Sequence, residues 1–268
     1  MVDQYKKLGI RFMKKLLTVS LLSAAVLAGT AQARDYDTVR FGVDVPYEPM
    51  EYRLPNGDLT GFDIELGNAL CDEIGIDCTW TVQGWDGIIP GLLARKYDAI
   101  MSSMTINDQR RKQVLFSDPY FTPPSAWFAP ADSKITVPSK QTLEGKTIGV
   151  QRGTLQDNYA TDMFGDVADI NRYSTADDMV LDMDAGRLDI VFLDFPVGKS
   201  TLLDSNNGDY KIVGKMISEP KKYFGDGFGI AFRKRDKELA EKFNAALATL
   251  KDNGTYDKLY SKYFETKK

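Results

Sequence analysis

The chain has 268 residues, of which 43% are hydrophobic and 27% are charged. This composition is typical of a globular protein with one large domain or two smaller ones, and it excludes collagen-like and disordered chains. Histidine is absent, which excludes catalytic and metal sites built on imidazole. A net charge of −4 argues against a nucleic-acid-binding surface, and two cysteines are too few for a zinc site made of cysteine alone.

The N-terminal segment has the pattern of a signal peptide. Residues 13–15 are Met-Lys-Lys, residues 16–28 are mostly apolar, and residues 31–33 form an Ala-Gln-Ala cleavage site. We therefore expect residues 1–33 to be an extension plus signal peptide, cleaved after Ala33. An uncleaved membrane anchor is the alternative, although the apolar run is short for a bilayer span.

Export also bears on charge and on the cysteines. Removal of residues 1–33 takes away five cations and one anion, so the net charge of −4 becomes −8 in the mature chain. Cys71 and Cys78 are seven positions apart, and in an oxidising compartment we expect them to form a local disulfide. A redox pair would require C-x-x-C spacing.

The first half of the mature chain alternates between two kinds of pattern. Short apolar runs rich in β-formers predict strands, and apolar residues at helical spacing predict helices. The resulting order, strand–helix–strand–helix–strand, predicts parallel strands in an α/β sheet. The predicted strands cover residues 39–43, 79–82 and 97–101, and the helices cover 62–70, with Gly75 just beyond, and 88–93.

The second half repeats this order. Residues 94–100 resemble residues 185–191, and residues 42–44 resemble residues 149–151. Two such pairs of similar segments, in the same order along the chain, favour two similar α/β lobes over one long sheet. The predicted strands cover 147–150, 170–173 and 188–192, and the helices cover 155–163 and 177–185, the latter capped by Thr175 and stopped by Gly186.

Two segments look like connections between the lobes. Four prolines lie within residues 119–130, and residues 220–229 are rich in glycine and charge, with backbone angles at the glycines that other residues avoid. The chain then ends in helices at 237–250 and 256–264, and we expect Tyr256, Tyr260 and Phe264, which recur every four residues in the last helix, to pack as core. The predicted boundaries are 34–121 plus 228–268 for lobe 1, 126–218 for lobe 2, and 122–125 and 219–227 for the crossing segments.

Polar residues gather after the predicted strands. In an open parallel sheet, ligands bind beyond the carboxyl ends of the strands. Arg110 lies nearby, at the start of a polar helix. The acids can hold an amine, and the guanidinium can hold a carboxylate. This combination suits a small zwitterion. The residues at the strand ends are Asp44 and Tyr47, Ser102, Ser103 and Thr105, Gln151 and Thr154, and Asp194.

Most of these residues also have a structural reading. Asp44 could be an ordinary turn acid, and the hydroxyls at 102–105 could cap a helix. Tyr47 and Trp85 could be core aromatics. Arg110 is followed by two basic residues and could belong to a solvated face. The residues alone leave these alternatives open.

Several short motifs, taken in order over residues 36–265, resemble a known family. The chain is similar to the periplasmic amino-acid-binding proteins of ABC importers, the type-II solute-binding class, and most similar to the lysine/arginine/ornithine- and histidine-binding branch. The motifs are GFDIELG at 61–67, DGIIPGL at 86–92, YDAIMSSMT at 97–105, DQR at 108–110, GRLD at 186–189, KYFGDG at 222–227 and NGTY at 253–256.

The resemblance implies two similar lobes with mostly parallel sheets, joined by a two-segment hinge, the arrangement called a Venus flytrap. It implies reversible binding of an amino acid without chemistry, no cofactor, no metal, and delivery to an inner-membrane ABC permease. We expect a monomer in the periplasm of a Gram-negative bacterium. Both cysteines stand where this branch carries its disulfide.

The resemblance also assigns roles to residues. Arg110 would pair with the ligand α-carboxylate, Asp194 would hold the α-ammonium, and Asp44 would meet a basic side-chain head. Tyr47 and Trp85 would sandwich the aliphatic stem. The other expected contacts are Ser102, Ser103, Thr105, Gln151 and Thr154, together with Gln156 at the far end of the ligand.

Departures from the family pattern leave the ligand's side chain open. Trp85 is bulky for its position, and Gln151 stands where lysine/arginine binders often have an apolar residue. The first choice is a cationic amino acid, and an opine conjugate of arginine or another polar amino acid is the alternative. A dehydratase on the same fold is a remote alternative, because it needs a general acid or base that the predicted site does not offer.

Overall fold

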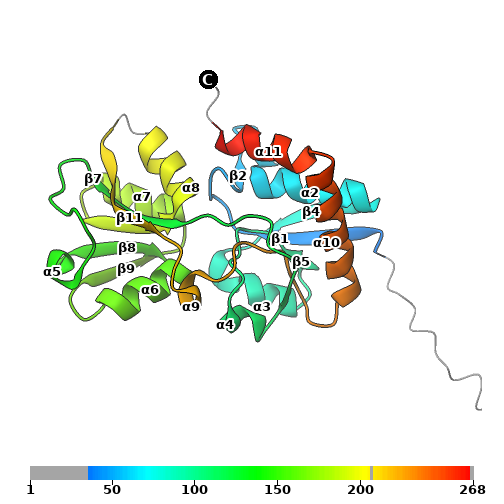
Figure 1. The fold of residues 1–268 in the computed structure, drawn as a ribbon, viewed down its shortest axis with the longest axis horizontal. Coiled ribbons are helices and arrows are strands. Elements are labelled where there is room, and N and C mark those ends of the chain that lie inside the picture. The colour runs from blue at the N-terminus through cyan, green and yellow to red at the C-terminus, as the bar shows by residue number, and fades with distance from the viewer. Residues whose placement is uncertain (1–35, 206–207, 266–268) are drawn as a thin grey trace, which may run out of the picture. The chain divides into compact units, whose positions relative to one another are not determined.

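The computed structural model describes residues 36–205 and 208–265, so the predicted signal peptide and its cleavage site lie outside the described residues. Within these ranges the chain forms two five-stranded sheets with helices packed on them (Figure 1). We call the part around the first sheet lobe 1 and the part around the second lobe 2. None of the helices in the described ranges is long and apolar enough to cross a membrane.

The sheet of lobe 1 has the order β4-β1-β5-β12-β6. β1 pairs in parallel with β4 and β5, as the strand–helix alternation predicted, whereas β12 is antiparallel to both of its neighbours. The strands are β1 (Thr38–Val43), β4 (Asp77–Val82), β5 (Ala99–Ile100), β6 (Leu115–Phe116) and β12 (Ala231–Phe232), and β2 (Tyr52–Arg53) and β3 (Leu59–Thr60) form a separate hairpin.

Helices cover this sheet and contribute its core. α2 ends where predicted, because Gly75 adopts the left-handed conformation (φ 78°) that glycine tolerates best. Ile88, Leu92, Tyr97 and Ile100 belong to one buried cluster. The helices are α2 (Phe62–Ile74), a 3₁₀ turn η1 (Trp85–Gly87), α3 (Ile88–Leu93), α4 (Asp108–Arg111), α10 (Lys237–Asp252) and α11 (Thr255–Phe264).

The sheet of lobe 2 has the order β11-β7-β10-β8-β9, with β8 parallel to β9 and β10 and with β7 antiparallel to its neighbours. Thr175 caps α7 as predicted, accepting from the Asp178 backbone N–H. The strands are β7 (Ser125–Pro130), β8 (Thr147–Gln151), β9 (Asp169–Tyr173), β10 (Ile190–Asp194) and β11 (Tyr210–Ile217). The helices are α5 (Lys140–Leu143), α6 (Leu155–Phe164), α7 (Ala176–Asp184), α8 (Phe195–Gly198), a π-helical turn η2 (Lys199–Asp204) and α9 (Lys221–Phe224).

The predicted duplication is present in the fold. Read from the edge strands β4 and β9, the first three strands of the two sheets have the same chain order, and the fourth is in each case the antiparallel strand that follows a connection between the lobes. The two glycines occupy equivalent places, since Gly42 pairs with Ile100 and Gly149 with Val191. A Cβ on Gly42 would lie 2.5 Å from the Tyr97 ring, and one on Gly149 would lie 2.6 Å from Leu188. Each glycine therefore makes room for the buried side chain that precedes the third strand of its lobe.

Two connections join the lobes, one between β6 and β7 and one between β11 and β12 (Figure 1). They are hydrogen-bonded to each other, since the Phe228 N–H donates to the Phe121 carbonyl at 2.7 Å. The predicted unusual backbone is confirmed at Gly225 (φ 59°) and Gly227 (φ 100°). At Gly227 a Cβ would approach the same Phe121 carbonyl to 2.7 Å, so the pairing of the two connections requires glycine.

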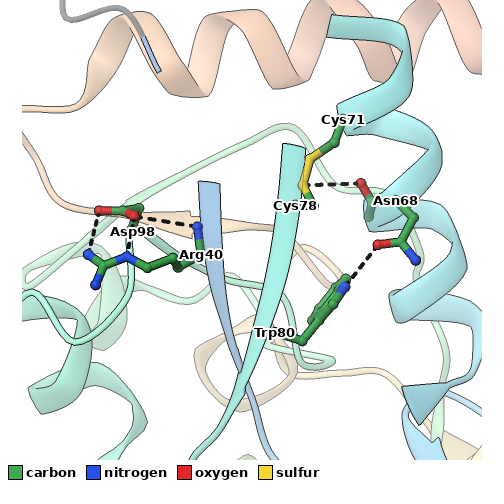
Figure 2. Close-up of a disulfide and its surroundings, with 7 residues drawn as sticks. Arg40, Asn68, Cys71, Cys78, Trp80 and Asp98 are labelled. Carbon is green, nitrogen blue, oxygen red and sulfur yellow. Dashed lines mark hydrogen bonds and ion pairs between the residues drawn. A yellow bond between two sulfur atoms is a disulfide. The ribbon is translucent and has the colours of Figure 1, made fainter. Parts of the chain in front are cut away.

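The expected disulfide is present. Cys71 near the end of α2 bonds Cys78 of β4, with 6.1 Å between the Cα atoms (Figure 2). Next to it, the Trp80 indole N–H donates to Asn68 Oδ1 at 2.9 Å. Because β4 is an edge strand, these contacts fasten α2 to the outer side of lobe 1.

Three sequence-based expectations are wrong in detail. β5 covers Ala99–Ile100 and not 97–101. β10 covers 190–194 and not 188–192, because Leu188 is buried in the turn after α7 and its burial does not make it a strand residue. The aromatic side chains of α11 do not form core. All residues of this helix stay at least partly exposed, Tyr260 at 37%, and the Phe264 ring stacks on Phe121 with 4.8 Å between centroids. Helical spacing predicts an apolar face but not how deeply it is covered.

Candidate ligand-binding site

A cavity of about 320 Å³ lies between the two lobes. It is found where strand-end residues from both sheets meet, as expected for open parallel sheets. All eleven residues proposed from the sequence line it, namely Asp44, Tyr47, Trp85, Ser102, Ser103, Thr105, Arg110, Gln151, Thr154, Gln156 and Asp194. Glu51 and Leu155 complete the lining.

Asp44 is a buried acid at the end of β1. Its backbone N–H donates to Ser102 Oγ at 2.9 Å, and its Oδ2 accepts from the Gln151 amide of lobe 2 at 2.8 Å. Burial raises the pKa of Asp44 to about 6, and the Gln151 hydrogen bond offsets part of that effect. Asp44 is therefore poised to ionise fully once a positive group lies beside it.

Arg110 is buried, which rules out the solvated basic face. It is 9% exposed, whereas the side chain of neighbouring Arg111 is 48% exposed. Asn107 caps α4 by accepting from the Arg110 backbone N–H, and the guanidinium donates to the Thr105 carbonyl at 2.9 Å. The guanidinium carbon lies 5.1 Å from the centroid of the Trp85 ring. Burial lowers the pKa of Arg110 to about 10, so the group remains cationic at neutral pH.

Asp194 ends β10 and faces the cavity from lobe 2. Its carboxylate accepts from the Tyr47 hydroxyl at 2.6 Å, from the Gln156 amide at 2.8 Å and from Ser125 Oγ at 3.4 Å. Burial raises the pKa of Asp194 to about 6, while these donors and the charge of Arg110 act in the opposite direction. The site thus holds a second acid whose charge a cation would stabilise.

Three further cavity residues form hydrogen bonds with other parts of the protein. The Trp85 indole N–H of lobe 1 donates to the Gly153 carbonyl of lobe 2 at 3.2 Å. The Trp85 side chain is half-buried, so it is not a core aromatic. Thr154 caps α6 and donates to the Gln151 carbonyl at 2.7 Å, so it combines a structural role with a place in the lining. Gln156 donates to Asp194 and Ser125 of its own lobe.

Sequence reasoning missed Glu51. It lies in the turn before β2, bridges Tyr47 through the backbone, and is 1% exposed. An acid in a loop next to a proline-containing turn looks like a surface residue, and no periodic pattern marks it as buried. Leu155, at the start of α6, was noted only as a departure from the family pattern.

The charges of the cavity define what it can hold. Three acids line the cavity, Asp44, Glu51 and Asp194, and Arg110 is the one cation among the described residues that line it. Glu51 is engaged with Ser102 Oγ and Ser103 Oγ, so Asp44 and Asp194 are the carboxylates that we assign to a ligand. Buried charges need partners of opposite sign. A molecule with two positive groups and one negative group complements this set.

The comparisons with known proteins agree with this geometry. Residues 39–266 match the model of the bacterial extracellular solute-binding proteins, family 3, so the chain belongs to that family. Its two-lobed α/β architecture is the periplasmic-binding-protein type II fold.

Similar proteins with assigned ligands span nearly the whole chain. The L-arginine-binding protein of Pseudomonas aeruginosa is 41% identical over 94% of this chain and 97% of its own length. The lysine/arginine/ornithine-binding periplasmic protein of Escherichia coli is 39% identical over the same shares. Among solved structures, an ancestral arginine-binding protein bound to arginine has a TM-score of 0.78 and 34% identity, covering 85% of this chain and 98% of that one.

Proposed function

We propose that this protein is a periplasmic receptor that captures a cationic L-amino acid of the arginine, lysine or ornithine type and delivers it to an ABC permease of the inner membrane. The observation that carries the proposal is the placement of the buried acids Asp44 and Asp194 in one cavity with the buried Arg110 guanidinium. Such an amino acid has two positive groups and one carboxylate, so every charge finds a partner. The relatives named for arginine, lysine and ornithine support the same class of ligand.

Each charged group then has one role. The Arg110 guanidinium pairs with the α-carboxylate, aided by backbone amides near Thr105 and Thr154. Asp194 holds the α-ammonium, with Ser103 and Thr105 alongside. Asp44 meets the positive group at the end of the side chain.

The remaining cavity residues shape the space around the ligand stem and orient the acids that bind it. Tyr47 and Trp85 flank the aliphatic stem of the ligand. Gln156 orients the Asp194 carboxylate through its 2.8 Å hydrogen bond. Gln151 does the same for the Asp44 carboxylate, and Ser102 Oγ accepts from the Asp44 backbone N–H.

Capture proceeds by closure of the lobes without a chemical step. The ligand first meets lobe 1, which holds Asp44, Ser102, Ser103 and Arg110, and bending of the segments at 122–125 and 219–227 brings Thr154, Gln156 and Asp194 over it. Closure excludes water, which strengthens the charge pairs. The closed monomer is the form that the permease accepts.

Titration calorimetry tests this function on protein freed of carried-over ligand by unfolding and refolding. The panel contains arginine, lysine, ornithine, histidine, glutamine, octopine and nopaline. We expect the three cationic amino acids to bind most tightly. Asp44→Asn, which keeps the shape but removes the charge, should weaken arginine binding about 100-fold, because a buried cation then lacks its partner, and should change glutamine binding little. A chain that binds none of the panel, or prefers an opine, contradicts the proposal.

A further inference from the structure

A second pair of acids lies directly behind the cavity. Glu51, before β2, is 1% exposed, and Asp63, in the first turn of α2, is fully buried. In the part of the chain that the structure describes, neither carboxyl group forms an ion pair with a lysine or arginine. Two uncompensated charges in such a place would be strongly unfavourable.

One carboxylate oxygen of Asp63 has no hydrogen-bond donor among the described residues. Its Oδ2 accepts from the Ser103 backbone N–H and from the Tyr120 hydroxyl, both at 2.7 Å. Its Oδ1 is buried, and no ordinary donor among the described residues reaches it. An acceptor buried without a donor destabilises the fold, so a donor at this oxygen is to be expected.

Glu51 is the group placed to supply it. Ser103 Oγ contacts both carboxyl groups, at 3.3 Å from Glu51 Oε2 and 3.4 Å from Asp63 Oδ2, and Ser102 Oγ donates to the other Glu51 oxygen at 2.8 Å. The Glu51 carboxyl thus lies within hydrogen-bonding reach of Asp63. An ionised carboxylate only accepts hydrogen bonds. A hydrogen bond between two carboxyl groups therefore requires that one of them carries a proton.

We propose that Glu51 is a positioning residue, whose carboxyl keeps a proton and donates it to Asp63 Oδ1, and that the joined pair fixes Ser102 and Ser103 at the wall of the cavity. This rests on the proposed function, because the placement of the serines matters only if the cavity takes a ligand. Burial, followed by the charge of Asp63, raises the pKa of Glu51 well above its usual range. Burial raises the pKa of Asp63 to about 6.

The titratable groups that face the pair are acids or phenols, and the Tyr120 hydroxyl stabilises the charge on Asp63 by donating to it. The groups are Asp44 after β1, Tyr47 in the same turn as Glu51, Tyr120 after β6 and Tyr256 of α11. None of these four can become a cation that would offset a second negative charge. Between the titration of Asp63 and that of Glu51, the pair therefore carries one negative charge and one proton.

The pair has a specific structural task. Ser103 is a non-glycine residue in the left-handed region (φ 50°), which needs support from its surroundings. Asp63 supplies that support through the Ser103 backbone N–H. Glu51 accepts from Ser102 Oγ, which in turn accepts from the Asp44 backbone N–H. The proton thus completes a chain of hydrogen bonds from α2 to the acid at the end of β1.

The proton itself is tested by nuclear magnetic resonance on protein labelled with carbon-13 at the glutamate side-chain carboxyl. Glu51→Gln identifies the Glu51 signal by its disappearance, and Glu73→Gln, which changes an exposed acid of α2, is the matched control. We expect the Glu51 signal to keep the shift of a neutral acid at pH 7. A Glu51 signal that titrates with the exposed glutamates would overturn the proposal.

The functional consequence is tested by arginine titrations of Glu51→Gln and Glu51→Leu from pH 7 to alkaline pH. Glutamine keeps a donor and an acceptor, so Glu51→Gln should bind within about threefold of the native protein, whereas Glu51→Leu should lose about tenfold, the worth of one good hydrogen bond. The native affinity should fall at alkaline pH, as Glu51 loses its proton, more than that of the Gln variant. Equal losses in both variants would show that the charge matters and would refute the idea.

These results separate the two proposals. If the native protein binds no amino acid of the panel, the proposed function fails, while the resonance titration still decides the protonation of Glu51. If Glu51→Leu does not fold, the titration and the Gln variant suffice. Normal arginine binding together with an ionised Glu51 would leave the proposed function intact and eliminate the positioning role.

Discussion

The Tyr47 hydroxyl donates to Asp194 Oδ2 at 2.6 Å, although the two residues are 147 positions apart and belong to different lobes. Together with the Gln151–Asp44 hydrogen bond, it places one buried acid from each lobe in contact with a side chain of the other. The carboxylates at the two ends of the cavity therefore depend on the way the lobes meet. In the proposed mechanism, ligand binding and closure of the lobes would therefore share these polar contacts.

Arg110 provides the sharpest test of the charge arrangement. Arg110→Ala leaves the ligand carboxylate without its buried partner, so the Kd for arginine should rise at least about 100-fold, because removing one member of a buried pair costs about 3–5 kcal/mol. Arg110→Lys keeps the charge but loses the planar fork and should recover only part of the affinity. Calorimetry gives the Kd values.

The control for that test is Arg111→Ala, since Arg111 is exposed and pairs with Asp226 away from the cavity. Its Kd should stay within about twofold of the native value, as expected for a surface ion pair. A loss of only about threefold in Arg110→Ala would rule out the assigned role of the guanidinium.

Arginine binding should strengthen as pH rises from 5 to 7. Asp44 and Asp194 have pKa values of about 6 in the unliganded cavity, raised mainly by burial. Positive groups of the ligand favour the ionised acids and lower both values, so binding below pH 6 releases protons and becomes weaker with acidity.

Calorimetry in buffers of different ionisation enthalpy counts the released protons. The native protein should release up to two near pH 5, one for each acid, and Asp44→Asn should release fewer by up to one. Proton uptake, or a Kd that does not change over this range, would contradict the assignment of both acids to cationic groups.

The disulfide should matter for stability and not for binding. It closes a short loop between α2 and the edge strand β4, so Cys71→Ser combined with Cys78→Ser should lower the free energy of unfolding by roughly 2–3 kcal/mol. Urea unfolding measures this change. The Kd for arginine should stay the same in the folded variant, and a large loss of affinity would show that lobe 1 needs the bond to keep the cavity in shape.

Gly42 should tolerate no side chain. A Cβ there would lie 2.5 Å from the Tyr97 ring, which is fully buried and held by a hydrogen bond from its hydroxyl to the Ile88 carbonyl. Gly42→Ala should therefore cost about 1–3 kcal/mol in the free energy of unfolding. Gly84→Ala is the matched control, because Gly84 has φ −56° and open space around its Cβ position. Equal unfolding midpoints for the two variants would count against this packing argument.

Periodicity predicted most of the regular structure. The parallel strands of both sheets, the stop of α2 at Gly75 and the cap of α7 at Thr175 depend on local residue chemistry, which a sequence displays directly. β12 was not predicted, because its two buried residues pair with β5 and β6, which precede it by more than a hundred positions. β11 was likewise hidden by polar residues on its open face.

For the candidate site, too, the sequence predicted some features, whereas others depend on contacts between distant segments. Strand-end position and residue type were enough to nominate the acids, the hydroxyls and Arg110, because the carboxyl ends of parallel strands must meet at one edge. Whether Arg110 is buried and Arg111 exposed depends on the helix orientation and on the Trp85 ring, and neither is visible in a run of three basic residues. The burial of Glu51 depends on Asp63, Ser102 and Ser103, which come from two other parts of the chain.

The class of fold, the duplicated plan, the disulfide partners and most of the residue types that line the cavity could be predicted from the amino-acid sequence. These follow from periodicity, caps and the chemistry of neighbouring positions. The three-dimensional arrangement was needed to establish which of those residues are buried, which acids are left without cations and which side chains contact the opposite lobe. Burial and pairing are properties of segments brought together from distant positions, and no local pattern records them.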